Sequence, residues 1–167
     1  TQSRSSAASD VYKRQTLPEH VLEWAKEVDG IVMGPMSTNE YPSKNNGGIN
    51  PSGTIRKKLD LFANIRPAKV FNSLTEASSL KKEVVENMDI IVLRELTGGI
   101  YFGEPRGIES YGNNLRRGIN TEVYNTNEII RLGKVGFEIA RKRKKLVHSI
   151  EKANVMESGI LWREEIN

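Results

Sequence analysis

The apolar residues of the first third of the chain recur at helical spacing in two segments. Residues 17–28 and 52–62 both carry apolar side chains three and four positions apart, and this spacing predicts two amphipathic helices. The short apolar run 31–33 lies between them and predicts a buried strand. Residues 37–51 are rich in Asn, Gly, Ser and Pro, a composition typical of a loop with turn residues.

The middle of the chain changes from helical spacing to short apolar runs. Residues 65–71 and 90–94 are rich in β-prone side chains and predict two strands, and residues 73–88 between them predict a loop and a short helix. The segment 97–124 holds six glycines and has little helical periodicity. It therefore predicts an extended arm or hairpin.

A third helix is predicted after this arm. Asn125 is a favourable N-cap residue, and Glu128, three positions later, completes a capping-box pattern. Gly133 and Gly136 lie on the apolar face of the predicted helix, although each glycine costs a helix about 1 kcal/mol relative to Ala. We therefore expect another element to approach this face closely.

The order of the elements predicts the fold class. After the third helix, residues 146–150 predict a strand and residues 153–166 a last helix. Strands and helices alternate along the chain, which is typical of an α/β protein. We expect a mixed sheet flanked by helices, from which residues 97–124 protrude as a β arm.

Composition narrows the class of protein further. The chain has 167 residues, of which 37% are apolar, enough for a compact core. It contains no cysteine, which excludes disulfides and thiolate metal sites, and its two histidines, His20 and His148, lie far apart in sequence. No run of about 18 apolar residues predicts a membrane span, and no apolar signal segment is present. We expect a cytoplasmic protein with no membrane partner.

The first fifteen residues and the basic residues add little to the functional picture. Residues 1–15 have a polar composition that predicts a disordered tail, and 5–15 is similar to a translated sequencing adapter, so we expect a non-native segment. The net charge of +4 does not by itself imply a nucleic-acid partner. We interpret the basic run 141–145 as a solvated helix end that complements the helix dipole, with a nucleic-acid patch as the alternative.

Three arginines lie at the ends of predicted elements and are candidates for anion binding. Arg56 lies in the second helix, Arg66 at the start of a strand and Arg94 at the end of a strand. Guanidinium groups bind carboxylates with two parallel hydrogen bonds, and ligands of α/β sheets collect at the carboxyl ends of strands. Spacing alone leaves two interpretations open, a site where the arginines converge or separate surface salt bridges.

Four short motifs carry a resemblance to a known family. They read RKKLDLFANIRP at 56–67, RELTGGIYFGEPRG at 94–107, KANV at 152–155 and LWRE at 161–164. In order and separation they resemble the isocitrate/isopropylmalate (β-decarboxylating) dehydrogenase family, and the last three are most similar to its isopropylmalate-type members. The resemblance covers essentially all of 17–167 and implies the middle part of a longer chain with this family's fold.

The resemblance implies a substrate-binding role for four residues. Arg56, Arg66 and Arg94 match the arginines that hold the substrate carboxylate later lost as carbon dioxide. Ser52 lies on the turn that faces the variable end of the substrate in this family. Isopropylmalate-type members usually carry leucines on that turn, and the polar residues found here are more similar to tartrate/D-malate-type or isocitrate-type members. Those substrates are therefore the alternative to isopropylmalate.

The resemblance also implies catalytic and cofactor-binding residues. Tyr101 matches the tyrosine that protonates the enol after decarboxylation. Lys152 matches a lysine, contributed by the neighbouring subunit, that helps to remove the hydroxyl proton of the substrate. Asn154 matches an asparagine near the nicotinamide. The implied cofactors are NAD and Mg²⁺ or Mn²⁺, and the metal ligands are expected beyond Asn167, so we expect the chain by itself to be inactive.

The resemblance assigns two partial domains and a set of partners. Residues 16–69 are expected to belong to a first, cofactor-side domain and residues 70–167 to a second, dimerisation domain that includes the arm 97–124. The implied partners are a small 2-hydroxy dicarboxylic acid and a second copy of the chain, bound through the arm and the helices of the second domain. No nucleic-acid partner is expected.

Overall fold

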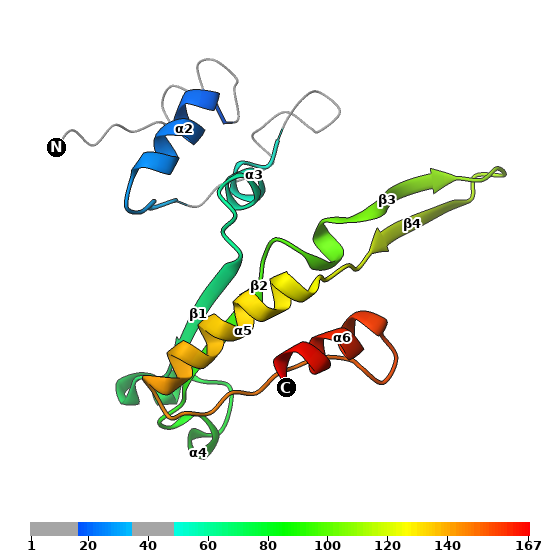
Figure 1. Ribbon diagram of the computed structural model, residues 1–167. Coiled ribbons are helices and arrows are strands. Elements are labelled where there is room, and N and C mark those ends of the chain that lie inside the picture. Colours follow the sequence, from blue (N-terminus) through cyan, green and yellow to red (C-terminus); the bar gives the residue numbers. More distant parts are fainter. Residues whose placement is uncertain (1–16, 35–48) are drawn as a thin grey trace. The chain divides into compact units, whose positions relative to one another are not determined.

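A computed structural model describes residues 17–34 and 49–167 (Figure 1). The predicted tail 1–15 and most of the predicted loop 37–51 lie outside the described residues. Contacts divide the chain into two compact units, Thr1–Leu61 and Phe62–Asn167, which we describe one at a time. No helix in the described part of the chain is both long and apolar enough to cross a bilayer.

The first unit contains the two predicted helices, α2 (Glu19–Glu27) and α3 (Pro51–Lys58). Helix α2 buries Leu22, and α3 buries Ile55, as the helical spacing predicts, together with Pro51 at its first position. The prediction of a buried strand at 31–33 is wrong, because this run forms no strand and is exposed. A lone strand leaves its backbone groups without partners, and no described residue pairs with this run.

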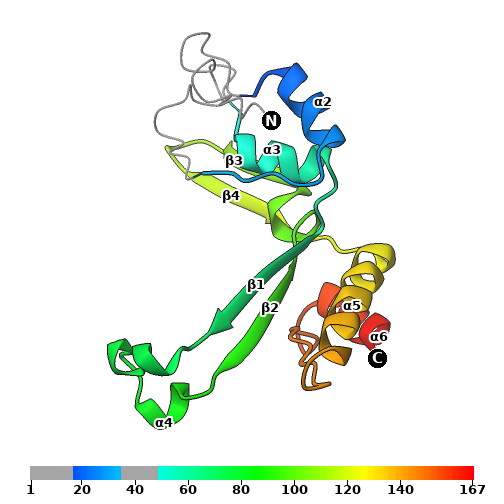
Figure 2. The same ribbon diagram turned by 90° about the vertical axis from the view of Figure 1, so that its left-hand side faces the viewer.

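The two strands predicted in the middle of the chain are present in the second unit. They are β1 (Ala63–Lys69) and β2 (Asp89–Glu95), which pair antiparallel along their whole length, as Figure 2 shows. The connection between them contains a 3₁₀ helix, Asn72–Ala77, and the short helix α4 (Lys82–Val85), which confirms the predicted loop and short helix. β1 carries Arg66 and β2 carries Arg94, two of the five candidate site residues of this unit.

The predicted arm is a hairpin. A 3₁₀ turn, Gly99–Tyr101, leads into β3 (Gly103–Ser110), which pairs antiparallel with β4 (Arg116–Thr121). Almost every residue of the two strands is exposed. The described strands thus form two separate antiparallel pairs, and together with the helices they confirm the α/β class.

Helix α5 (Thr126–Arg141) has the predicted cap and the predicted close contacts. The carboxylate of Glu128 accepts hydrogen bonds from the backbone N (2.9 Å) and the side-chain Nδ2 (3.2 Å) of Asn125. A Cβ atom added to Gly133 would lie 2.9 Å from Cδ1 of Ile166, and one added to Gly136 would lie 3.2 Å from Cδ1 of Leu93. The two glycines therefore admit the last helix and strand β2 to the face of α5.

The basic end of α5 agrees with the helix-end interpretation. All five residues of 141–145 are exposed. Arg143 forms an ion pair with Asp89 at the start of β2, at 2.9 Å, and donates a hydrogen bond to its backbone carbonyl at 3.0 Å. The side-chain hydrogen bond from Arg143 lowers the pKa of Asp89 below its usual value. One residue of the run thus ties α5 to the ribbon formed by β1 and β2.

Two predictions for the C-terminal part need correction. Residues 146–150 form no strand, since no described strand pairs with them, and Ser149 instead accepts a hydrogen bond from Nε1 of Trp162 at 3.1 Å. The last helix, α6 (Glu157–Ile166), begins four residues later than predicted. The reason is local, because the carbonyl of Lys152 accepts hydrogen bonds from the backbone N of Val155 and Met156, which forms a turn before the helix.

The core of the second unit gives a first testable prediction. Ile129 of α5 is fully buried, whereas Leu80, in the connection between β1 and β2, is 59% exposed. Ile129→Ala should lower the free energy of unfolding by about 2–5 kcal/mol, because it removes buried apolar atoms and leaves a cavity. Urea unfolding measures the change, with Leu80→Ala as the control. Equal effects of the two substitutions would contradict this assignment of the core.

Candidate active site

One face of the β1–β2 ribbon carries two of the three candidate arginines. Asn64 lies directly opposite Arg94, so their side chains project from the same face, and Arg66 follows Asn64 by two residues on that face. Nε of Arg66 donates a hydrogen bond to Oδ1 of Asn64 at 2.5 Å. The register therefore brings Arg66 and Arg94 to the same face.

The opposite face of the ribbon is used by helix α5. Leu93 contacts Gly136, and Glu95 forms an ion pair with Arg131, one turn before that glycine. Side chains alternate along a strand, so Arg94 projects away from α5 between these two residues. Within the described part of the chain, no ion pair joins Arg66 or Arg94 to a carboxylate.

Arg94 lies against the candidate catalytic tyrosine. Its guanidinium carbon is 4.7 Å from the centroid of the Tyr101 ring, within the range of a cation–π contact. The ring is 55% exposed, so solvent reaches the side chain. The backbone carbonyl of Tyr101 accepts a hydrogen bond from Arg106, which ties the 3₁₀ turn to the first residues of the arm.

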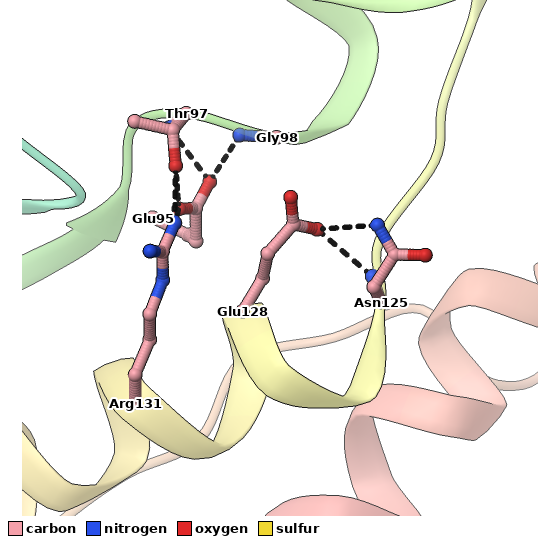
Figure 3. Close-up of polar contacts among 6 residues, drawn as sticks. All are labelled: Glu95, Thr97, Gly98, Asn125, Glu128 and Arg131. Carbon is pink, nitrogen blue, oxygen red and sulfur yellow. Dashed lines mark hydrogen bonds and ion pairs between the residues drawn. The ribbon is translucent and has the colours of Figure 1, made fainter. Parts of the chain in front are cut away.

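The buried carboxylate of Glu95 holds the turn between Arg94 and Tyr101, and Figure 3 shows its contacts with Thr97, Gly98 and Arg131. The side chain of Glu95 is 1% exposed. One oxygen accepts from the backbone N of Thr97 (2.9 Å) and Gly98 (2.6 Å), and the other accepts from the hydroxyl of Thr97 (2.7 Å). Nη2 of Arg131 donates to the Thr97 hydroxyl at 2.6 Å and lies 3.4 Å from Glu95. We did not assign Glu95 a role from the sequence.

A sequence signal for Glu95 does exist. When an acidic residue precedes a glycine-containing turn, its carboxylate can accept hydrogen bonds from the backbone amides two and three residues further along the chain. The signal is weak, because it does not show that the carboxylate becomes buried. Burial depends on Arg131, which lies 36 residues further along the chain, and this pairing is a tertiary contact that the local sequence does not reveal.

Two glycines are required beside this turn. A Cβ atom on Gly98 would lie 2.9 Å from the Glu128 carboxylate, and one on Gly99 would overlap the Tyr124 hydroxyl. Gly99 also has φ of +75°, a conformation that favours glycine. Burial is the main cause that raises the pKa of Tyr124 above its usual value, and the carboxylates of Glu122 and Glu95 add to it.

The structure does not bring Lys152 and Asn154 to the arginine face. Both side chains are exposed on the turn before α6. Among the residues that the structure describes, no hydrogen bond or ion pair joins Lys152 to Arg66, Arg94 or Tyr101. The role of Lys152 in a neighbouring subunit's site therefore stays a prediction.

The remaining candidates, Arg56 and Ser52, lie in helix α3 of the first unit. Both side chains are half-buried. The hydroxyl of Ser52 donates to Oδ1 of Asn50 at 2.9 Å, and the same oxygen accepts from the backbone N of Gly53 at 3.1 Å. The side chain of Asn50 thus caps the helix, and the polar groups of this turn are hydrogen-bonded to one another.

The described residues do not provide the ligands for a divalent metal ion. Mg²⁺ and Mn²⁺ prefer several oxygen ligands, usually including protein carboxylates. Within 17–34 and 49–167, no three acidic or histidine side chains gather at one point. Asn154 is the one residue that the resemblance assigns to cofactor binding, and it is an exposed turn residue. We therefore derive no step through a metal ion from these residues.

Comparison with known proteins identifies the family. A family model described as isocitrate/isopropylmalate dehydrogenase matches residues 2–167, including the predicted tail. The chain is 48% identical over 160 residues to a 3-isopropylmalate dehydrogenase of Rhodospirillum rubrum (93% of this chain, 43% of the relative). It is 59% identical over 138 residues to that of Pelagibacter ubique (82% and 37%). The chain belongs to the isocitrate/isopropylmalate dehydrogenase family, a family of decarboxylating dehydrogenases.

Solved structures agree on the fold. An isocitrate dehydrogenase from Methylococcus capsulatus matches 97% of this chain and 45% of its own length, with a TM-score of 0.66 and 20% identity. A β-decarboxylating dehydrogenase from Thermococcus kodakarensis matches 95% and 41%, with a TM-score of 0.58 and 20% identity. At this identity the likeness shows the fold alone. The chain spans less than half the length of the curated relatives named above.

The buried carboxylate gives a second testable prediction. Glu95→Gln should speed amide hydrogen exchange at Thr97 and Gly98 by about 5- to 30-fold, equivalent to about 1–2 kcal/mol, because a neutral amide accepts weaker hydrogen bonds and directs its NH₂ group at donors. NMR-detected exchange measures this change. Glu104→Gln is the matched control, since Glu104 is an exposed acid on the same motif. Unchanged exchange at both amides would contradict the role of Glu95.

Proposed function

We propose that the complete protein containing this chain catalyses the NAD-dependent oxidative decarboxylation of 3-isopropylmalate, a 2-hydroxy dicarboxylic acid. The names of the most similar relatives support this substrate, since those named above are 3-isopropylmalate dehydrogenases. The observation that carries the proposal is the pairing of Arg94 with Tyr101 on a face that also carries Arg66.

The proposed role of the arginine face is to bind the carboxylate that is later lost. A guanidinium donates two parallel hydrogen bonds to a carboxylate, which fixes its orientation as well as its position. Glu95, the acid next to Arg94, is buried on the other face of the ribbon. The charges of Arg66 and Arg94 are therefore available to the substrate, and Arg56 of α3 is the proposed third contact.

The proposed roles of Tyr101 and Lys152 are proton transfers. NAD, when bound, would supply the acceptor for the hydride that leaves the hydroxyl carbon. Lys152 accepts the hydroxyl proton, and the resulting β-keto acid loses carbon dioxide when the bond to the carboxylate carbon breaks and its electron pair forms an enolate. The Tyr101 hydroxyl then donates a proton to the carbon that carried the carboxylate, which gives the ketone product. Its position beside Arg94 places a donor next to the guanidinium that holds the departing carboxylate.

The proposed assembly is a homodimer. Lys152 acts in the neighbouring subunit's site under this proposal, so a second copy of the chain is required. Exposed apolar side chains on the arm and helices support such an interface. Ile108 of β3, Phe137 of α5 and Ile160 of α6 are all exposed, and apolar side chains exposed in this way are typical of surfaces that bind another chain.

A second substrate class is favoured by one observation. The turn before Arg56 presents Asn50 and Ser52, whose polar groups are hydrogen-bonded to each other. An isopropyl group gains little from burial against such a turn, and a mismatch of this size changes specificity by roughly 1–3 kcal/mol. Tartrate, D-malate or isocitrate is therefore the alternative substrate, with the same proton transfers.

The experiment that tests the proposal uses the complete protein with NAD, a divalent metal ion and each hydroxy acid. Lys152→Met should lower kcat by about 10²–10⁴-fold with little change in KM, because it removes a proton acceptor. Arg94→Lys should lower kcat and raise KM, because an ammonium group cannot form the paired hydrogen bonds of a guanidinium. Reduced NAD is followed by absorbance.

Lys81→Met serves as the control for loss of a lysine, since Lys81 is exposed at the start of α4. It should leave both constants unchanged. Near-normal turnover by Lys152→Met would disprove the role given to that residue. Failure of the unaltered protein to oxidise any of the four acids would disprove the proposed function.

A further inference from the structure

The turn that carries Lys152 is held by a carboxylate that we did not single out from the sequence. Glu151 directly precedes Lys152, and its side chain is 16% exposed, in contrast to the exposed lysine. One oxygen of Glu151 accepts hydrogen bonds from both Nε (2.9 Å) and Nη2 (2.7 Å) of Arg163 in α6. The other oxygen accepts from the backbone N of Ala153. The carboxylate therefore binds the residue that follows Lys152 and also joins the turn to α6.

The backbone of the same turn lies directly on α6. A Cβ atom on Gly159 would be 2.7 Å from both the carbonyl carbon of Lys152 and the nitrogen of Ala153, so no other residue fits at this position without displacing backbone. The Lys152 carbonyl accepts from the backbone N of Met156 at 3.0 Å, immediately before α6 begins. The turn thus packs directly against the first part of the helix.

Helix α6 is itself attached to the base of the arm. The hydroxyl of Ser158 donates to Glu122 at 3.2 Å, and the ring of Trp162 packs edge-on against Tyr124 with 5.3 Å between the centroids. These two contacts place α6 relative to the segment that follows β4. The Glu151–Arg163 pair then places the turn relative to α6, and among the residues that the structure describes no other side-chain contact from 151–154 does so.

We propose that Glu151 and Arg163 are positioning residues for Lys152, whose backbone they hold so that its side-chain amino group is presented at a defined place. This inference rests on the proposed function, in which Lys152 accepts a proton from a substrate bound by another subunit. Lysine has a flexible four-carbon side chain. Its reach is therefore defined mainly by where its backbone is held, and a displacement of about 1 Å at a reacting group can cost about 10²-fold in rate.

The charge state of Glu151 agrees with this role. The hydrogen bond from the Ala153 amide is the main cause that lowers the pKa of Glu151, and the hydrogen bonds from Arg163 add to it. Glu151 therefore stays ionised at neutral pH, where the proposed reaction takes place. An ionised carboxylate is the form that binds both partners most strongly.

The test uses the complete protein and two measurements. Glu151→Gln should raise hydrogen exchange in the peptide that covers 149–156 and lower kcat by about 10- to 100-fold, with KM for the hydroxy acid changed less than about twofold. Arg163→Lys keeps the charge but loses the two-nitrogen fork, so it should give a smaller change of the same kind. Glu164→Gln is the matched control, because Glu164 is an exposed acid next to Arg163 on α6.

Each outcome decides the proposal. Faster exchange with unchanged kcat would overturn it, because the pair would then hold the turn without serving Lys152. A rise in KM equal to the fall in kcat would also overturn it, since that result indicates loss of substrate binding. If the unaltered protein oxidises none of the hydroxy acids, the proposed function fails, whereas the exchange data still show whether the pair holds the turn. If Glu151→Gln does not fold, Arg163→Lys supplies the same comparison.

Discussion

The carboxylate of Glu95 organises the second unit. It is buried, it accepts hydrogen bonds from the backbone of Thr97 and Gly98, and it pairs with Arg131 of α5. A buried charge is tolerated only when it is paired and hydrogen-bonded, so these contacts must form together. Because side chains alternate along a strand, placing Glu95 against α5 turns Arg94 to the other face, and the turn that Glu95 holds brings Tyr101 to Arg94.

The same division of faces explains why α5 carries glycines. Gly136 admits Leu93 of β2, and Gly133 admits Ile166 of α6, so the helix lies close to both neighbours. Larger side chains there would move α5 away from the ribbon and separate Arg131 from Glu95. Glycine lowers the intrinsic stability of α5 at these two positions, but it allows the helix to lie close to the strand that carries Arg94.

Features that depend on residues close to one another along the chain could be predicted from the sequence. The strands β1 and β2, the hairpin arm, the cap of α5 at Asn125 and the close approach at its two glycines were all expected and are present. The strands expected at 31–33 and 146–150 are not, because a strand needs a pairing partner that its own sequence does not specify. The role of Glu95 was not predicted for the same reason, because its burial depends on an arginine that is distant in the sequence. Arg66 and Arg94, by contrast, lie on one face because of the register of the two strands.

The most direct measurement is a crystal structure of the complete protein with a 2-hydroxy dicarboxylic acid bound. We expect one carboxylate of the ligand within hydrogen-bond distance of the guanidinium groups of Arg66 and Arg94, the Tyr101 hydroxyl directed at the same molecule, and Glu95 still buried against Arg131. A ligand bound elsewhere, with Arg94 turned to pair with Glu95, would contradict this account.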